Sequence, residues 1–334
     1  METIPRLFEE SLKKYGQNPL IREKKDGSYQ SISYREVHAY VQHLASALLD
    51  LGIAKNDRVA LISEGRSEWL ISELALLYCG AIVVPLSNKL TEAEELRFRL
   101  QHSGCRYIIV SGQQAEKIRS LMSQVKNLEK LILFDNEPGK SDNEILYDDL
   151  LQQGKAFLPQ WKAILQERWM NIKGDDMATI SYTSGTTADP KGIMLTHLNY
   201  ITNLEQANSL IDVPPWYTTL LILSWDHSFA HTVGLYVMIR NGASLAVVAQ
   251  GKTQLETLRN IPLNLKEVRP VFMLSVPALA RSFRKNIEKG VKSKGKFMFR
   301  LFQQALKVSY KYHGNGYDPK TLQQMLLAPL VKLY

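Results

Sequence analysis

The segment 182–192, Tyr-Thr-Ser-Gly-Thr-Thr-Ala-Asp-Pro-Lys-Gly, concentrates polar side chains between two apolar runs. It has four Ser/Thr hydroxyls, two glycines and one lysine, Lys191. Such a loop offers backbone N–H groups, hydroxyl donors and a mobile ammonium, which are the groups that hold the oxygens of a polyphosphate. It is not a Walker A motif, because Gly185 is not followed by four residues and then Gly-Lys-Ser/Thr. A flexible surface turn is the alternative interpretation of a generic Ser- and Gly-rich stretch.

The apolar runs predict a strand on each side of this loop. Residues 177–182 are expected to form the strand that enters it, and residues 192–195 a short strand that leaves it. Thr196 can cap a helix that runs to about residue 210, because its hydroxyl can accept from a free helical N–H. The later apolar runs predict strands at 220–223, 244–249 and 271–275.

Apolar strands alternate with amphipathic helices in the first half of the chain. Ser33 with Glu36, and Thr91 with Glu94, have the spacing of a capping box, which satisfies free N–H groups at the start of a helix. Strands that are apolar throughout indicate a mostly parallel sheet covered by helices on both faces, which is the α/β class. The strands that carry this prediction lie at 58–63, 81–86, 106–111 and 128–135, and the helix between the first two lies at 67–78.

The predicted α/β fold divides into two subdomains with mostly parallel sheets flanked by helices. The first is expected to span residues 1–175 and to end in a peripheral helix and connector at 144–175. The second is expected to span 176–334 and to carry the candidate phosphate loop. Asp318 and Pro319 open a last helix that has no stop signal, so the second subdomain is interpreted as truncated.

Several motifs, in this order along the chain, resemble those of the adenylate-forming superfamily of acyl-CoA synthetases, luciferases and peptide-synthetase adenylation domains. The segment 182–192 is similar to the signature loop, and Ser33-Tyr-Arg-Glu and residues 78–86 are similar to two earlier motifs. Residues 223–229 resemble the strand that ends beside the acyl pocket, and residues 269–277 look most like the long-chain fatty acyl-CoA synthetase branch. The resemblance covers essentially the whole chain.

The resemblance implies that the protein activates a fatty acid, with long chains preferred, by joining it to ATP and then to the thiol of coenzyme A. Mg²⁺ would bridge phosphate oxygens, with no protein ligand assigned to it. His227 would line the carboxylate end of the acyl pocket as a catalytic residue. The residues implied to bind the nucleotide phosphates through hydroxyls, close backbone approach or positive charge are Thr183, Ser184, Gly185, Thr186, Thr187 and Lys191.

The sequence departs from the family at two places. Ala188 stands where the family usually has Gly, and an alanine costs about 1 kcal/mol if the backbone there requires positive φ. The family's Tyr-Gly-x-Thr-Glu motif, ribose-binding Asp and small C-terminal domain with a catalytic Lys have no counterpart here. The chain is therefore interpreted as an N-terminal fragment with little or no activity by itself.

Other interpretations of these residues remain open. His227 could be a half-buried structural histidine, and its spacing from His231 beside Asp226 would allow zinc, although no HExxH motif or nearby cysteine supports a metal site. Trp225 and Phe229 could wall the acyl pocket or simply belong to the core. The acid could instead be aromatic or an amino acid, or the protein could be a non-catalytic acyl- or nucleotide-binding module.

Composition indicates a globular protein with one strongly basic segment. The chain has 334 residues and a net charge of +8, and the segment 281–311 has ten Lys/Arg and one acid. A solvated helical face is the default interpretation of this segment, contact with anionic membrane comes second, and no nucleic-acid motif accompanies it. Two cysteines in apolar surroundings suit a reducing cytosol, and no apolar run is long enough to span a bilayer. A cytoplasmic location, with possible membrane association, is the expectation.

Overall fold

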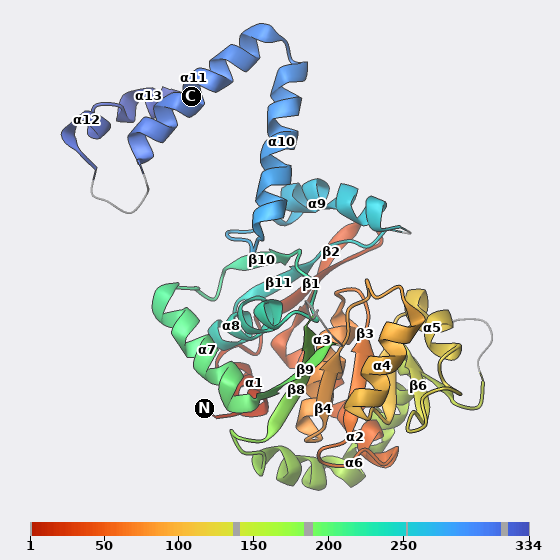
Figure 1. Ribbon diagram of the computed structural model, residues 1–334. Helices are drawn as coiled ribbons and strands as arrows, with labels where there is room; N and C mark the ends of the chain where they lie inside the picture. The colour runs from red at the N-terminus through yellow and green to blue at the C-terminus, as the bar shows by residue number, and fades with distance from the viewer. Residues whose placement is uncertain (1, 136–140, 184–189, 252, 315–319, 334) are drawn as a thin grey trace. The chain divides into compact units, whose positions relative to one another are not determined.

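The computed structural model describes residues 2–135, 141–183, 190–251, 253–314 and 320–333. Backbone contacts divide the chain into two compact units, Met1–Leu274 and Ser275–Tyr334. The first unit contains both sheets, and the second contains helices among its described residues (Figure 1). No helix among the described residues is both long and apolar enough to cross a membrane.

A seven-stranded sheet forms the centre of the first unit, with the strand order β7-β6-β5-β3-β4-β8-β9. All neighbours in it pair in parallel except β8 and β9, which are antiparallel. Residues that are apolar throughout make β3, β4 and β5 fit a sheet that is buried on both faces. The strands are β3 (Arg58–Ile62), β4 (Ile82–Pro85), β5 (Tyr107–Val110), β6 (Lys130–Leu133), β7 (Glu144–Leu146), β8 (Met177–Thr183) and β9 (Lys191–Thr196).

A second sheet has four strands in the order β10-β11-β1-β2. The strands β10 (Thr218–Leu221), β11 (Ser244–Val247) and β1 (Pro19–Lys25) are parallel, and β2 (Ser28–Ser33) is antiparallel to β1. The second sheet therefore joins the two ends of the first unit's sequence. Both sheets take strands from either side of residue 175. The subdomain boundary that was expected at this residue stays a prediction.

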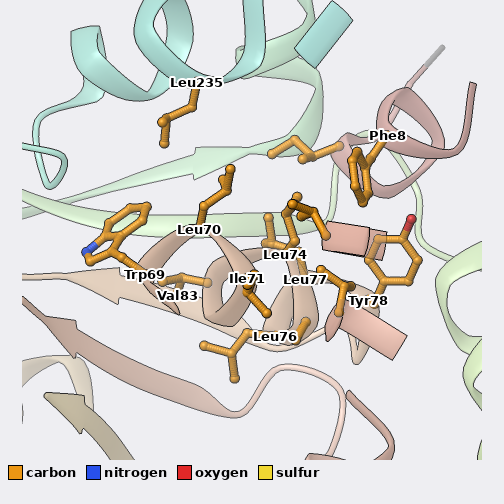
Figure 2. Close-up of a cluster of buried hydrophobic side chains, with 14 of the residues drawn as sticks. Phe8, Trp69, Leu70, Ile71, Leu74, Leu76, Leu77, Tyr78, Val83 and Leu235 are labelled. Carbon is orange, nitrogen blue, oxygen red and sulfur yellow. The ribbon is translucent and has the colours of Figure 1, made fainter. Parts of the chain in front are cut away.

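Two hydrophobic clusters hold the layers of the first unit together. One lies between the seven-stranded sheet and the helices α4 (Ala93–Ser103) and α5 (Gly112–Arg119). The other, larger cluster includes residues of both sheets and of α1 (Ile4–Tyr15), α2 (Tyr34–Asp50) and α3 (Ser67–Tyr78). Every residue of α3 except Glu68 is buried, and Figure 2 shows its Leu70 between Leu235 and Val83 of β4. This helix therefore lies at the centre of the core.

The remaining helices cover the sheets or follow them in the chain. The helix α6 packs along α2, where Gly154 lies so close to the His43 carbonyl that a Cβ atom would be 1.8 Å from its oxygen. The remaining helices of the first unit are α6 (Tyr147–Met170), α7 (His197–Leu210), the π-helix η1 (Ala230–Tyr236), α8 (Val237–Asn241) and α9 (Gln254–Val268).

The second unit contains α10 (Pro277–Ser293), α11 (Lys296–His313), α12 (Leu322–Met325) and α13 (Ala328–Leu333). The basic segment 281–311 lies on α10 and α11, and α11 has no buried residue among those described. Asp318 and Pro319, which were expected to open the last helix, lie outside the described residues.

The structure confirms the α/β class and corrects two local predictions. Ser33 and Glu36 form the expected capping box, but α4 begins at Ala93 after Glu92, and the Thr91 side chain makes no cap hydrogen bond. The Thr91 hydroxyl instead donates to Glu92 Oε1 at 3.4 Å. The strand expected at 271–275 is reduced to a single bridge between Phe272 and Thr219.

Candidate active site

The two ends of the predicted phosphate loop lie side by side at the carboxyl edge of the seven-stranded sheet. Thr183 ends β8, Lys191 begins β9, and these two residues are direct partners in the antiparallel pair. Because β8 is parallel to β4, the loop leaves the sheet at the edge where α/β proteins bind ligands. Ser184, Gly185, Thr186 and Thr187, like Ala188, lie outside the described residues.

The Lys191 side chain is exposed and available to an anion. Neither Lys191 nor Thr183 makes a side-chain hydrogen bond or ion pair with any residue that the structure describes. Their backbone positions are nevertheless fixed by the β8–β9 pairing, which continues to Met177 and Thr196. The geometry therefore places a fixed backbone and an exposed lysine side chain, which has no partner in the described parts of the chain, at the mouth of the loop.

Tyr182 fastens the incoming strand to the helix α4. Its hydroxyl donates to the carbonyl of Arg99 at 3.2 Å and lies 2.8 Å from His102 Nδ1. The Arg99 guanidinium carbon is 5.7 Å from the centre of the Tyr182 ring, within the range of a cation–π contact. Burial raises the pKa of Tyr182 above its usual range, so the phenol stays neutral and keeps its proton for these contacts.

His227 lies on an exposed turn that follows β10. Its backbone N–H donates to the Ser224 carbonyl at 3.2 Å, and its Nδ1 accepts from the Phe229 N–H at 3.2 Å. The Phe229 N–H therefore favours the tautomer in which Nε2 carries the proton and faces away from this bond. The turn lies at the carboxyl edge of the four-stranded sheet, because β10 and β11 are parallel.

A cavity of about 280 Å³ opens at the carboxyl edges of both sheets. This volume is just below the usual range for small-molecule pockets, about 300–1,000 Å³. Residues at the ends of β3 and β4 and on α5 line it together with residues at the ends of β10 and β11 and on α9, and the lining is both polar and apolar. Representative residues from six segments that line it are Ser63, Asn88, Gln114, Leu223, Val248 and Leu258.

Trp225 forms part of the cavity wall and belongs to the core as well. It is 3% exposed, and its ring meets that of Trp69 edge to face at 5.5 Å. Gly65 makes room for it, because a Cβ atom there would be 2.3 Å from the Trp225 Nε1. Phe229, for which the sequence left open a place in the pocket wall or in the core, is 43% exposed.

His231 occupies a different environment from His227, although the two are four residues apart. His231 is fully buried and lies 2.8 Å from the Glu73 carboxylate, whereas His227 is exposed. No group of three or more His, Cys, Asp or Glu residues in the described parts of the chain is arranged to hold a metal ion. Glu73 went unrecognised in the sequence, and its signal was an acid in the middle of an otherwise apolar helix.

A comparison with protein families decides which class this site belongs to. The AMP-binding enzyme model matches residues 8–328. The chain belongs to the AMP-binding enzyme family. The family's large domain accounts for the α/β fold, and its solved members share this architecture.

Curated relatives of this AMP-binding enzyme act on fatty acids according to their names. The chain is 26% identical over 290 residues to human long-chain-fatty-acid–CoA ligase ACSBG2, covering 86% of the chain and 42% of the relative. It is 30% identical over 228 residues to fatty acyl-CoA synthetase A of Dictyostelium discoideum, covering 65% of the chain and 32% of the relative. The chain thus spans less than half the length of these relatives.

Solved structures of other AMP-binding enzymes have the same fold. The inhibitor-bound N-terminal domain of FACL13 from Mycobacterium tuberculosis is 25% identical, with a TM-score of 0.69 that covers 85% of this chain and 65% of that one. The A-PCP didomain of carboxylic acid reductase from Segniliparus rugosus has a TM-score of 0.75 at 17% identity, covering 91% of this chain and 47% of that one. The second likeness concerns the fold alone.

Proposed function

We propose that the intact protein activates a fatty acid with ATP to an acyl-adenylate and then transfers the acyl group to coenzyme A. One observation carries this proposal: Thr183 and Lys191 are paired across the mouth of the loop at the sheet's carboxyl edge, and the exposed Lys191 side chain has no partner among the described residues. The names of the relatives support a fatty acid as the substrate.

The first step would take place at the α-phosphate of ATP. A carboxylate oxygen of the acid attacks phosphorus, a new O–P bond forms, and the bond to the departing pyrophosphate breaks. The pyrophosphate carries the growing negative charge, so a positioned ammonium and N–H or hydroxyl donors lower the barrier. Lys191 would supply that charge, and Thr183, Ser184, Thr186 and Thr187 would donate hydroxyls.

The second step would be attack of the coenzyme A sulfur on the acyl carbonyl carbon, with AMP leaving. His227 would contact the reacting carboxylate or carbonyl, since its exposed ring lies on the turn beside the cavity wall. Mg²⁺ would be held mainly by phosphate oxygens, because Mg²⁺ in nucleotide sites usually has few protein ligands.

The cavity gives a physical reason to expect an acid with an apolar tail. Leu223, Val248 and Leu258 form its apolar side, and burying one methylene there is worth about 0.8 kcal/mol. The opposite side, with Asn88 and Gln114, offers polar groups toward the nucleotide end. Each added carbon within the cavity should therefore strengthen binding until the space is filled.

The test is ATP–pyrophosphate exchange by the full-length protein with a panel of acids. Saturated fatty acids of increasing length should support exchange, and benzoate and free amino acids should support much less. Exchange that requires an amino acid or benzoate would contradict the fatty acid assignment. No exchange with any acid, in the presence of Mg²⁺, would contradict adenylation itself.

Contact of the basic segment 281–311 with an anionic membrane stays a prediction. The segment has ten Lys/Arg against one acid, and the Phe297 side chain on α11 is 77% exposed. Basic residues with exposed aromatic and aliphatic neighbours favour a lipid surface. Flotation with phosphatidylserine vesicles should recover the full-length protein, and phosphatidylcholine vesicles should not. Equal recovery with both would contradict this prediction.

A further inference from the structure

A fully buried acid–histidine pair lies behind the candidate site. Glu73 on α3 and His231 on η1 are each 0% exposed, and Glu73 Oε1 lies 2.8 Å from His231 Nε2. The carboxylate at this short distance favours the charged form of the imidazole. The Tyr236 hydroxyl donates to the same Glu73 oxygen at 2.9 Å.

Stability alone does not explain this pair. Removing two charges from water costs several kcal/mol per ion, and apolar residues of similar volume often stabilise a core at least as well. The cost is not fully offset here, because Glu73 Oε2 and His231 Nδ1 have no hydrogen-bond partner among the described residues. The benefit must therefore be sought in what the pair holds in place.

The pair joins the two halves of the site. Glu73 belongs to α3, which follows β3 of the seven-stranded sheet, whereas His231 belongs to η1, which follows β10 of the four-stranded sheet. A π-helix is rare, and such helices are frequent at functional sites. Three rings surround the His231 ring with centres 5.3, 5.9 and 6.0 Å away, those of Trp69, Tyr200 and Tyr236. The imidazole is thus held on several sides.

Two kinds of contact connect His231 with the supports of the site. The backbone N–H of His231 donates to the carbonyl of His227 at 3.1 Å, so the residue whose ring contacts Glu73 also bonds the turn that carries the exposed imidazole, and its ring packs against that of Tyr200 with centres 5.9 Å apart. In the other direction, the neighbouring Tyr200 hydroxyl lies 2.9 Å from Thr179 Oγ1 on β8, the strand that leads into the phosphate loop. The same buried cluster therefore contacts the supports of both predicted binding regions.

The local electrostatics favour a charged imidazole. Burial is the largest influence on the pKa of His231 and lowers it, but the Glu73 carboxylate, Asp226 and the backbone hydrogen bond to His227 together raise this pKa above its usual value. Burial and the same carboxylate also raise the pKa of Tyr236 well above its usual range, so that phenol remains a donor.

We propose that Glu73 and His231 are a positioning pair that holds His227 at a fixed place relative to β8, so that a bound carboxylate meets the nucleotide correctly. This inference rests on the proposed function for its activity test, but its structural part does not. Neither residue touches substrate, because both are fully buried.

Hydrogen–deuterium exchange of the chain tests the structural part. Glu73→Gln keeps the shape of the side chain and removes its charge, so amides of 227–236 should exchange about tenfold faster or more, while those of β5 should not change. The matched control is Glu144→Gln, because Glu144 is a buried acid that pairs with Arg119 at 2.9 Å on the β7 edge of the same sheet. The control should leave 227–236 unchanged. Equal exchange in this segment for natural protein and Glu73→Gln would overturn the inference.

Pyrophosphate exchange by the full-length protein tests the functional part. Glu73→Gln should raise the KM for the acid about fivefold or more and change the KM for ATP less than about twofold. In a His227→Ala background the same substitution should have almost no further effect on the acid KM, because the pair acts through His227. An undiminished effect in that background, or an unchanged acid KM, would overturn the inference.

A second variant guards against simple unfolding. Glu73→Met with His231→Leu replaces the pair by apolar residues and should fold with a Tm near or above that of the natural protein. It should still raise the acid KM about fivefold or more. Normal kinetics in this folded variant would show that the pair is merely structural. Absence of exchange by the natural protein with every acid is a separate result, which contradicts the proposed function and leaves hydrogen exchange to decide the positioning role.

Discussion

Polar side chains at the amino edges of the two sheets differ from those at the carboxyl edges in whether they have partners within the described parts of the protein. At the amino edges these side chains bind one another: Ser33 caps α2 with Glu36, and Lys55 lies 2.7 Å from Asp176. At the carboxyl edges Lys191 and Thr183 have no side-chain partner among the described residues, and the buried Ser181 hydroxyl has none either. Some polar groups there do pair, as Arg66 does with Asp135 at 2.9 Å.

This difference teaches where a ligand is needed. Buried or constrained polar groups normally have partners, so groups left without one require an explanation. At the amino edges the protein supplies the partner and gains stability. At the carboxyl edge of the seven-stranded sheet a phosphate-bearing ligand would complete the set, and the exposed side chains of Lys191 and Thr183 cost little while water hydrates them.

Two lysine variants test the difference between the amino and carboxyl edges most directly. Lys191→Ala in the full-length protein should slow adenylation about 100- to 1,000-fold, because a positioned charge near the leaving group is lost. Thioester formation from preformed acyl-adenylate should fall far less, and single-turnover kinetics separates the steps. Lys55→Ala at the amino edge is the matched control. It should lower the free energy of unfolding by at most about 1 kcal/mol and leave the activity unchanged. Equal loss in both steps for Lys191→Ala would point to misfolding.

The pH dependence of the free energy of unfolding tests a buried histidine at the amino edge, His197. His197 Nδ1 accepts from the Ile4 N–H at 3.3 Å, and burial lowers the pKa of His197 from 6.5 to about 4, with Asp176 opposing and Lys55 aiding the change. As the pH falls, His197 is therefore protonated in the unfolded chain before it is protonated in the folded protein. The contribution of the neutral His197 to the free energy of unfolding is complete above pH 6.5 and is lost as the pH falls toward 4. The loss should be about 3 kcal/mol.

Urea denaturation at pH 7 and pH 4.5 measures this loss. His197→Gln should weaken the dependence on pH, although it also removes an acceptor at every pH. The natural protein and the variant should therefore converge toward the acidic end. Two parallel stability curves across this range would contradict a buried, neutral His197.

A glycine at the carboxyl edge should show both stability and binding effects. Gly65→Ala forces the Trp225 indole to move, because the new Cβ would be 2.3 Å from its Nε1. It should destabilise the protein by about 1–3 kcal/mol and raise the KM for the acid more than that for ATP. Gly290→Ala, where no atom lies within 4 Å of the new Cβ in α10, should instead be neutral or slightly stabilising. Unaltered acid binding in Gly65→Ala would argue against the cavity.

The smallest effect compares the two capping-box sequences. Ser33→Ala removes the hydroxyl that accepts from the Glu36 N–H and should cost about 1 kcal/mol. Thr91→Ala removes no cap bond and should change stability by less than about 0.5 kcal/mol. Thermal unfolding of the two variants checks this. Equal costs would mean that the Thr91 box forms in solution.

The sequence alone determined the local elements. The helix 67–78 has the predicted bounds, and Thr196 caps α7 as expected. These features are contiguous in sequence, so the spacing of apolar residues, caps and turn formers carries the information. The hydroxyls, glycines and lysine of 182–192 are also contiguous in sequence, so the sequence alone was enough to predict a phosphate loop there, and its role stays a prediction.

Only the tertiary structure decided which distant segments meet. Nothing local to β1 indicates that it pairs with β11, and nothing local to Glu73 indicates that it faces His231. Nor could spacing reveal that the Thr91 box stays open, because the chain's path after β4, and not local propensity, sets the first residue of α4. Sheet order, cavity walls and buried charge pairs depend on packing between segments far apart in sequence. The free energy of such packing belongs to the whole core and cannot be assigned to any one stretch of residues.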